Sequence, residues 1–293
     1  MASGSGDLLT FHHVDVFSDE PMGGNGLTVV HAPSPQDTSL MQRITRELRQ
    51  FETIFLFEED ADGASARIFT EDEELLFAGH PVLGAAAVLH QRHRPQDLAA
   101  DWSIRVGGRP LAVHVRQTER PTVLDASMNQ GAATTSATLT DTQRLDFAAA
   151  LGVPQVELDQ ALPAQVVSTG LPYLLVPVSA AGLALSRVAV PDLEERLLAV
   201  GAKFVYVLDP EAPEGRTWDN AGRVEDVATG SAAGPAAAYL IAHGVQSADR
   251  PFRISQGRFT GRPSSIRVHQ DPSGSLWVGG SVTPFSDGVL RIA

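Results

Sequence analysis

The sequence of 293 residues contains no cysteine. This absence excludes disulfide bonds, thiolate-bound zinc, iron–sulfur clusters and every mechanism in which a thiol acts as nucleophile or base. Long apolar runs are also absent, because no stretch reaches the roughly 20 residues that span a bilayer. Residues 1–6 have neither the basic nor the apolar segment of a secretory signal. We therefore expect a cytoplasmic protein with no membrane contact.

Basic residues are scarce, since 22 Lys and Arg face 35 Asp and Glu and the formal net charge is −13. Nucleic acids and anionic membranes bind basic surfaces, so neither is expected as a partner. The overall field also repels a small anion, which must be held by local dipoles or by a few cations. The composition, 43% hydrophobic and 19% charged, is that of a globular chain long enough for two cores.

Familiar nucleotide and hydrolase motifs are incomplete. Gly24-Asn25-Gly26 follows an apolar segment, but Val29 stands where a dinucleotide fingerprint needs its third glycine, and a strand follows instead of a helix. No phosphate-binding loop ending in Gly-Lys-Ser/Thr occurs. A Gly-x-Ser-x-Gly turn is absent as well, because Ser231 directly follows Gly230. Nucleotide binding and serine-hydrolase chemistry are therefore disfavoured.

A glycine turn followed by a run of small residues occurs twice. Residues 79–84 (GHPVLG) precede an alanine-rich segment, and about half the chain later residues 228–234 (ATGSAAG) precede another. Each copy predicts a turn that opens a helix. A helix start has unpaired N–H groups and the positive end of the peptide dipoles, which together favour an anion. Two equivalent turns predict one site, between two halves, for a small carboxylated or otherwise anionic substrate.

The repeat extends beyond the glycine turns. The predicted order in each half is helix, strand, turn, strand, turn and helix. Before the first glycine turn these elements are a helix at 39–48 and strands at 53–57 and 67–70; before the second they are a helix at 192–200 and strands at 204–208 and 216–219. A shared order of this length indicates two related α+β units, each a strand-rich sheet around a central helix.

The predicted boundary lies at residue 124, which gives an N-terminal half of residues 1–124 and a C-terminal half of residues 125–285. The final strand, at about 286–293, is expected to return to the first half. Thr140 and Gln143 have the spacing of a capping box and predict the start of a helix.

Glu52 lies between a predicted helix and a very apolar strand. Apolar surroundings favour the neutral form of a carboxyl group, which suits a general base near neutral pH. Ala202 and Lys203 occupy the corresponding place in the second half, so this carboxylate breaks the internal symmetry. We therefore predict that Glu52 is catalytic; the alternative is a strand-end glutamate that points to water.

Three further polar residues lie at the predicted helix starts. His80 belongs to the first, where a helix cap or a packed imidazole is the alternative to substrate binding. Asp226 precedes the second and Ser231 lies within it. Capping explains either one alone, but both together at a predicted anion site favour a role in binding. Residues 90–95 (HQRHRP) alternate His with Arg, which disfavours a dication, so we expect a solvated loop and no metal site.

Taken together, these motifs resemble the PhzF-like family of phenazine-biosynthesis isomerases, whose fold is that of diaminopimelate epimerase. The resemblance runs nearly end to end. It comprises residues 14–17 with Gly24-Asn25, Glu52-Thr53, residues 77–81 with Gly84, residues 168–172, Glu225-Asp226 with residues 228–234, and Gln256-Gly257 with residues 261–264. Val227, Gly26 and Phe259 depart from the family pattern and leave the substrate open.

The resemblance implies two pseudo-symmetric α+β halves, each a mostly antiparallel barrel-like sheet around a central helix, with the active site in the cleft between them. It also implies a homodimer and no cofactor. In the isomerase that gives the family its name, a glutamate moves a proton on one face of a dihydro-hydroxyanthranilate, and Glu52 falls at that position. His80, Asp226 and Ser231 fall where the substrate's polar groups are held, and Gly79 and Gly230 would supply backbone N–H groups.

The related epimerases use two thiols, which the composition excludes here. The leading hypothesis is a cofactor-independent isomerase that shifts a proton on a small cyclic or amino-acid-like carboxylate, with Glu52 as both acceptor and donor. One alternative is an enzyme of secondary metabolism that couples the same base to C–C or C–N bond cleavage. Another is a non-catalytic protein that binds a small molecule on the same scaffold.

Overall fold

The computed structural model describes residues 7–292, which form two compact units. Unit 1 contains residues 7–128 and 279–292, and unit 2 contains residues 129–278. The segment 1–6, considered above as a possible signal, lies outside the described residues. The predicted boundary at residue 124 falls at the first residue of strand β8 (Leu124–Ala132).

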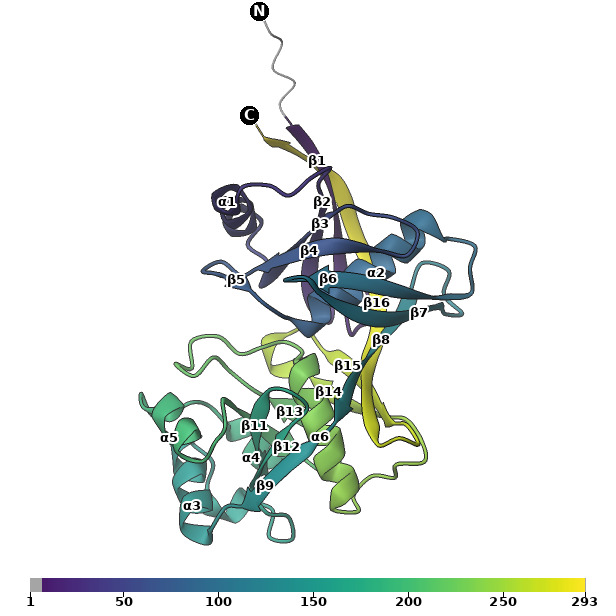
Figure 1. Cartoon of the computed structure of the whole chain (residues 1–293). Helices are drawn as coiled ribbons and strands as arrows, with labels where there is room; N and C mark the ends of the chain where they lie inside the picture. Colours follow the sequence, from purple (N-terminus) through teal and green to yellow (C-terminus); the bar gives the residue numbers. More distant parts are fainter. Residues whose placement is uncertain (1–6, 293) are drawn as a thin grey trace, which may run out of the picture. The chain divides into compact units, whose positions relative to one another are not determined.

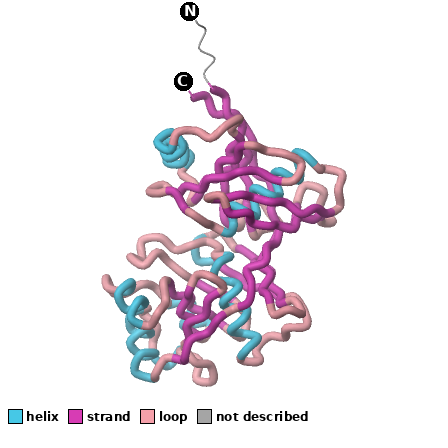
Figure 2. The backbone as a smooth tube through the Cα atoms, in the orientation of Figure 1, coloured by secondary structure: helices cyan, strands magenta, loops and turns pink. Residues whose placement is uncertain are grey.

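Unit 1 is built mainly from strands (Figures 1 and 2). Its strands are β1 (Asp7–Val16), β2 (Asn25–His31), β3 (Glu52–Phe57), β4 (Gly63–Phe69), β5 (Glu74–Leu75), β6 (Ala99–Val106), β7 (Arg109–Gln117), most of β8, and most of β16 (Ser275–Ile292). Its helices are α1 (Thr38–Leu48) and α2 (Gly79–His93).

The sheet of unit 1 follows the order β1-β2-β3-β4-β6-β7-β8-β16, and β16 pairs again with β1. That last pairing is antiparallel and runs from Asp7 opposite Ile292 to Val16 opposite Val282. The strands therefore form a closed circuit. Two neighbouring pairs, β2 with β3 and β4 with β6, are parallel. Because a parallel pair needs a crossover connection, α1 links the first pair and α2 links the second.

Unit 2 combines strands with more helices, most of them shorter than those of unit 1. Its strands are β9 (Thr134–Thr138), β10 (Gln165–Ser168), β11 (Pro172–Pro177), β12 (Phe204–Asp209), β13 (Glu214–Arg216), β14 (Phe252–Gln256) and β15 (Ser264–Gln270). Its helices are α3 (Asp141–Ala150), η1 (Gln155–Glu157), α4 (Ala180–Leu185), α5 (Leu193–Ala199), α6 (Gly230–Ala242) and η2 (Arg258–Thr260).

The sheet order in unit 2 repeats that of unit 1. Strands β10 to β15 are neighbours in sequence order, and the parallel pairs are β11 with β12 and β13 with β14. Helices α4 and α5 connect the first of these pairs and α6 connects the second. The remaining strand pairs are antiparallel. The predicted α+β fold, with two related and mostly antiparallel halves, is confirmed.

Helices α2 and α6 are the central helices of their units. Every residue of α2 from His80 to His90 is buried, and most of α6 is buried as well. A helix enclosed on all sides needs small residues where it meets the sheet closely. At Gly84 of α2, a Cβ atom would lie 2.4 Å from Leu27 Cδ2 and 3.1 Å from Val16 Cγ2. The first glycine turn therefore ends in a residue that packing restricts to glycine.

Two local predictions are settled by the hydrogen bonds. The capping box at Thr140 and Gln143 is confirmed at the start of α3. The predicted strand at 216–219 is wrong beyond Arg216, because the carbonyl of Val205 in β12 accepts a hydrogen bond from Thr217 Oγ1, at 2.6 Å, and the ladder of β13 stops there. Trp218 forms only an isolated bridge with Glu225.

The prediction of a solvated loop at 90–95 is wrong for its first residues. Helix α2 continues to His93, and His90 is only 1% exposed. Its Nε2 lies 3.0 Å from the carbonyl oxygen of Asp97, and its Nδ1 accepts a hydrogen bond from Trp102 Nε1. Tertiary contacts with β6 thus bury an imidazole that its neighbours suggested was exposed. The described residues contain no group of three or more His, Asp and Glu arranged to hold a metal ion.

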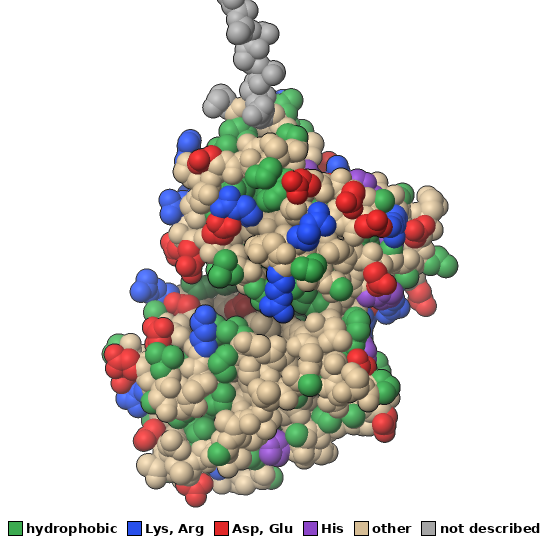
Figure 3. All heavy atoms as spheres, in the orientation of Figure 1, with side chains coloured by type: hydrophobic (Ala, Val, Ile, Leu, Met, Phe, Trp, Pro, Cys, Tyr) green, Lys and Arg blue, Asp and Glu red, His purple; other side chains and the backbone are tan. Residues whose placement is uncertain are grey.

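Two other expectations concern partners, since neither a nucleic acid nor a membrane is expected to bind this chain. Figure 3 shows acidic side chains scattered among basic ones on the face in view, without one continuous basic area. Between residues 7 and 292, no helix combines the length and the apolar character needed to cross a membrane.

We predict that Gly84→Ala destabilises the protein although alanine favours helices. The new methyl group would overlap Leu27 and Val16, and overpacking a tight core costs about 1–3 kcal/mol of unfolding free energy. Urea unfolding followed by circular dichroism measures this loss. Gln91→Ala, at an exposed position of the same helix, is the control and should change the value by less than about 0.5 kcal/mol. A stabilised Gly84→Ala variant would contradict the packing described here.

Candidate active site

Glu52 is the first residue of β3, where the chain enters the sheet beside Leu27 of β2. The preceding turn is set by Arg49, which ends α1 in a left-handed conformation. Glu52 is 6% exposed, whereas the neighbouring Phe51 is 45% exposed. The alternative of a glutamate pointing to water therefore does not apply. A buried carboxyl group in an apolar strand needs a polar partner, and the side chain of His80 lies close to it.

His80 is the second residue of α2 and is also 6% exposed. Its Nδ1 lies 3.5 Å from Glu52 Oε2. Burial lowers the pKa of His80 from its ordinary value of 6.5 to about 3, so the imidazole is neutral at physiological pH. Its Nε2 is buried and has no hydrogen-bond partner in the described part of the chain. Unit 1 thus brings together the predicted base and one predicted binding residue.

Both predicted helix starts lack a side-chain cap. Helix α2 begins at Gly79 after Ala78, and α6 begins at Gly230 after Thr229, and neither of these preceding residues caps the helix with its side chain. Apart from the adjacent chain and the backbone of α2 itself, no atom of the described residues lies within 4 Å of the position that a Cβ at Gly79 would take. These are the features of the two anion-binding turns that the sequence predicts.

Asp226 lies in unit 2, in the loop that leads to α6. Its Oδ2 accepts a hydrogen bond from Thr229 Oγ1 at 2.5 Å, and its Oδ1 accepts a longer one, of 3.4 Å, from the N–H of Ala228. The loop is held by Gln256, which is 1% exposed. Gln256 Nε2 donates to the carbonyl of Asp226 at 2.9 Å and to Thr229 Oγ1 at 3.0 Å, and its Oε1 accepts from Tyr206 Oη at 3.1 Å.

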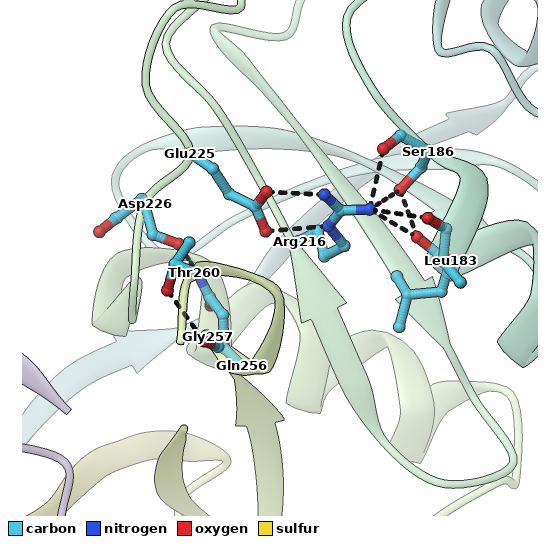
Figure 4. A network of polar contacts seen from close by, with 9 residues as sticks. Leu183, Ser186, Arg216, Glu225, Asp226, Gln256, Gly257 and Thr260 are labelled. Carbon is cyan, nitrogen blue, oxygen red and sulfur yellow. Dashed lines mark hydrogen bonds and ion pairs between the residues drawn. The ribbon is translucent and has the colours of Figure 1, made fainter. Parts of the chain in front are cut away.

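A buried ion pair fixes the same loop from the other side (Figure 4). Arg216, the last residue of β13, donates through Nε and Nη2 to Glu225 at 2.9 and 2.6 Å. Its Nη1 donates to the carbonyls of Leu183 and Ser186, at 2.9 and 2.8 Å. Arg216 is 8% exposed, and Glu225 directly precedes Asp226. The pair therefore anchors the chain immediately before the predicted binding residue.

Phe259, one of the departures from the family pattern, belongs to this network. The guanidinium groups of Arg216 and Arg258 lie over its ring, at 4.2 and 4.1 Å from the centroid. Arg258 also contacts Glu214 through its Nε. Phe259 therefore supplies cation–π contacts to the arginine that holds Glu225.

Ser231 is the second residue of α6, and its Oγ lies 2.8 Å from Tyr173 Oη of β11. The carbonyl of Gly230 accepts a hydrogen bond from Gln130 Nε2 at 3.0 Å, and Gln130 Oε1 accepts one from Thr169 Oγ1 at 3.0 Å. A Cβ at Gly234 would lie 2.2 Å from Gln130 Oε1, so the last glycine of the second turn leaves room for this side chain.

The structure thus places Glu52 beside His80 in unit 1, and the loop of Asp226 beside Gly230 and Ser231 in unit 2. Their catalytic and binding roles stay predictions. Sequence reasoning missed four polar residues that hold these groups: Gln130, Tyr173, Arg216 and Gln256. Of these four, only Gln256 belongs to a motif that the sequence analysis identified, Gln256-Gly257.

The comparisons with known proteins point to one family. The sequence model of the phenazine biosynthesis-like proteins, PhzC-PhzF, matches residues 14–288. A relative from Pseudomonas chlororaphis, named trans-2,3-dihydro-3-hydroxyanthranilate isomerase, is 32% identical over 263 residues, which cover 86% of this chain and 88% of the relative.

Comparison with solved structures gives the same result. A predicted epimerase from Pseudomonas aeruginosa is 46% identical, has a TM-score of 0.89, and matches over 97% of this chain and 99% of its own. A probable proline racemase from Agrobacterium radiobacter shares the fold alone, with a TM-score of 0.59 and 11% identity, over 97% of this chain and 93% of its own.

We predict that Arg216→Gln lowers the free energy of unfolding by about 3–5 kcal/mol, because it leaves the largely buried Glu225 without its cation. Chemical denaturation followed by tryptophan fluorescence measures the loss. The matched control is Arg196→Gln, which removes an exposed pair with Asp192 and should have no measurable effect. Equal stabilities for the two variants would rule out the anchoring role of Arg216.

The lowered pKa of His80 also makes the free energy of unfolding depend on pH. Its folded-state pKa of about 3 lies below the ordinary 6.5, so the unfolded chain binds more protons between these values. Stability is therefore lost as the pH falls from about 6.5 towards 3, by up to about 1.4 kcal/mol per pH unit. His80→Asn should flatten this slope in urea unfolding at pH 7 to 4. His114→Asn, at a solvent-accessible histidine, should leave the acid loss in place. An unchanged slope in His80→Asn would contradict the burial argument.

Proposed function

Because the chain belongs to the PhzC-PhzF family of phenazine biosynthesis-like proteins and is an isomerase, we propose that it shifts a proton within a small cyclic or amino-acid-like carboxylate. The family, the isomerase class and the fold that the motifs predicted are confirmed. Glu52 takes the proton from one carbon and returns it to another. The substrate gains and loses no atoms, and the electron pair of the broken C–H bond moves along its double bonds.

The observation that carries this proposal is the buried contact of Glu52 with His80. Burial keeps the imidazole neutral, so no full positive charge from His80 holds Glu52 permanently as a carboxylate. A carboxyl group in such a place can alternate between its charged and neutral forms, which a residue that both accepts and donates a proton must do.

We propose that Asp226, Gly230 and Ser231 of unit 2 bind the same substrate molecule as Glu52 and His80 of unit 1. The helix starts at Gly79 and Gly230 offer N–H groups to a carboxylate, Asp226 offers a carboxylate to an amine, and Ser231 offers a hydroxyl. The compound named for the Pseudomonas chlororaphis relative, trans-2,3-dihydro-3-hydroxyanthranilate, carries a carboxylate, an amine and a hydroxyl group, and is the first compound to test. A homodimer in the cytoplasm, working without a cofactor, is part of this proposal.

Glu52→Gln should lose at least about a hundredfold in turnover of trans-2,3-dihydro-3-hydroxyanthranilate while keeping its fold, because the amide cannot accept the proton. Mass spectrometry of the product measures conversion, and incubation in heavy water should place deuterium at the carbon that receives the proton. An unchanged product mass apart from deuterium separates isomerisation from C–C or C–N bond cleavage.

The matched control is Glu58→Gln, an exposed glutamate just beyond the other end of β3, which should turn over the substrate like the wild type. Near-wild-type turnover by Glu52→Gln would rule out the proposed base. Tight binding of the compound by the wild type without conversion would favour the non-catalytic alternative.

A further inference from the structure

Tyr173 and Ser231 form a hydroxyl pair that the proposed mechanism does not yet use. Tyr173 lies in β11, is 3% exposed, and places its Oη 2.8 Å from Ser231 Oγ. The chain has three tyrosines, all within the described residues. Tyr206 donates to the side-chain oxygen of Gln256 and Tyr239 donates to the carbonyl of Pro163, and neither acceptor has a proton of its own to give. Tyr173 alone is paired with another hydroxyl.

We propose that Tyr173 is a positioning residue, which donates its hydroxyl proton to Ser231 Oγ and thereby directs the serine's own proton towards an anionic group of the substrate. This inference rests on the proposed function, in which Ser231 binds the substrate.

The direction of the hydrogen bond decides what Ser231 can bind. A serine hydroxyl has one proton and two lone pairs. If Ser231 gave its proton to Tyr173, its oxygen would present only lone pairs to the substrate, which repel an anion. If Tyr173 is the donor, the serine proton stays available. An anion bound at Ser231 therefore stabilises the arrangement in which Tyr173 is the donor.

The surroundings keep on Tyr173 the proton that it would donate. Burial raises the pKa of Tyr173 above its ordinary value, and the negative charge of Asp226 acts in the same direction. The phenol therefore stays protonated over the whole physiological range. Asp226, in the loop before α6, is also predicted to bind substrate, and its charge adds to the effect of burial on Tyr173.

The backbone of Ser231 is fixed separately. Gln130 Nε2 donates to the carbonyl of Gly230, and this carbonyl shares its peptide plane with the N–H of Ser231. Gln130 therefore fixes the direction of the serine's N–H, while Tyr173 fixes that of its O–H. Two donors from one residue, each held by a different side chain, suit a carboxylate with two oxygens.

A thiol probe tests the pair without any substrate. Since the chain has no cysteine, Ser231→Cys introduces a single thiol at this position, and the pH profile of its alkylation by iodoacetamide gives its pKa. In Ser231→Cys/Tyr173→Phe the thiolate loses a hydrogen-bond donor, so we expect its pKa to be higher by about 1 to 2. Ser231→Cys/Tyr239→Phe removes a matched buried hydroxyl elsewhere and should match Ser231→Cys alone. Equal values in all three would overturn the proposal.

Steady-state kinetics with trans-2,3-dihydro-3-hydroxyanthranilate test the consequence for binding. Tyr173→Phe should raise KM by about 3- to 10-fold with little change in kcat, because the lost contact serves substrate binding. In the background of Ser231→Ala, the same change should have no further effect, since the two residues act as one unit. Tyr239→Phe should keep the wild-type KM.

The two kinds of failure are distinguishable. If the wild type does not convert this compound, the proposed function is wrong, and the thiol measurement still decides whether Tyr173 donates to position 231. If the wild type converts it but Tyr173→Phe keeps the wild-type KM, or raises KM equally in the Ser231→Ala background, the positioning role is overturned.

Discussion

In each unit the strands of the sheet surround one central helix, and this packing determines which residues the helix can carry. Helices α2 and α6 are buried on nearly every side, and at Gly84 and Gly234 neighbouring side chains occupy the place that a Cβ would take. Neither helix has a side-chain cap at its first turn. Unpaired donors at a buried helix start are costly unless water or a ligand meets them. The packing of the core thus creates the polarity of the predicted site.

The two units use the same scaffold for different tasks. In unit 1 the helix start is accompanied by a buried carboxyl group and an imidazole that burial keeps neutral, which is the arrangement that the proposed proton transfer uses. In unit 2 the corresponding region is filled with fixed hydrogen bonds. Gln256 and the Arg216–Glu225 pair hold the loop of Asp226, and Tyr173 contacts Ser231. The repeated fold therefore carries different polar groups at the corresponding helix starts of its two units.

Local sequence signals predicted the parts of the structure that local interactions determine. The helix expected at 39–48 is α1, the capping box at Thr140 begins α3, and the glycine turns open α2 and α6. What escaped prediction depends on partners far apart in the sequence. Tyr173 meets Ser231 only because β11 lies beside α6, and His90 is buried by Trp102 of the following strand. Periodicity and spacing do not encode such pairings, which arise from the order of strands in the sheet.

This difference between the units bears on the stereochemistry of the proposed reaction. Inversion at one carbon needs a proton acceptor on one face and a donor on the opposite face, which the related epimerases provide with two thiols. This chain has no thiol, and the positions in unit 2 that correspond to Glu52 hold Ala202, which is buried, and Lys203, whose ammonium group lies over the ring of Phe204. A single carrier can only return the proton to the face from which it took it. The proposed shift between two carbons of one conjugated system needs only one carrier, whereas the 46% identical Pseudomonas aeruginosa relative is described as a predicted epimerase.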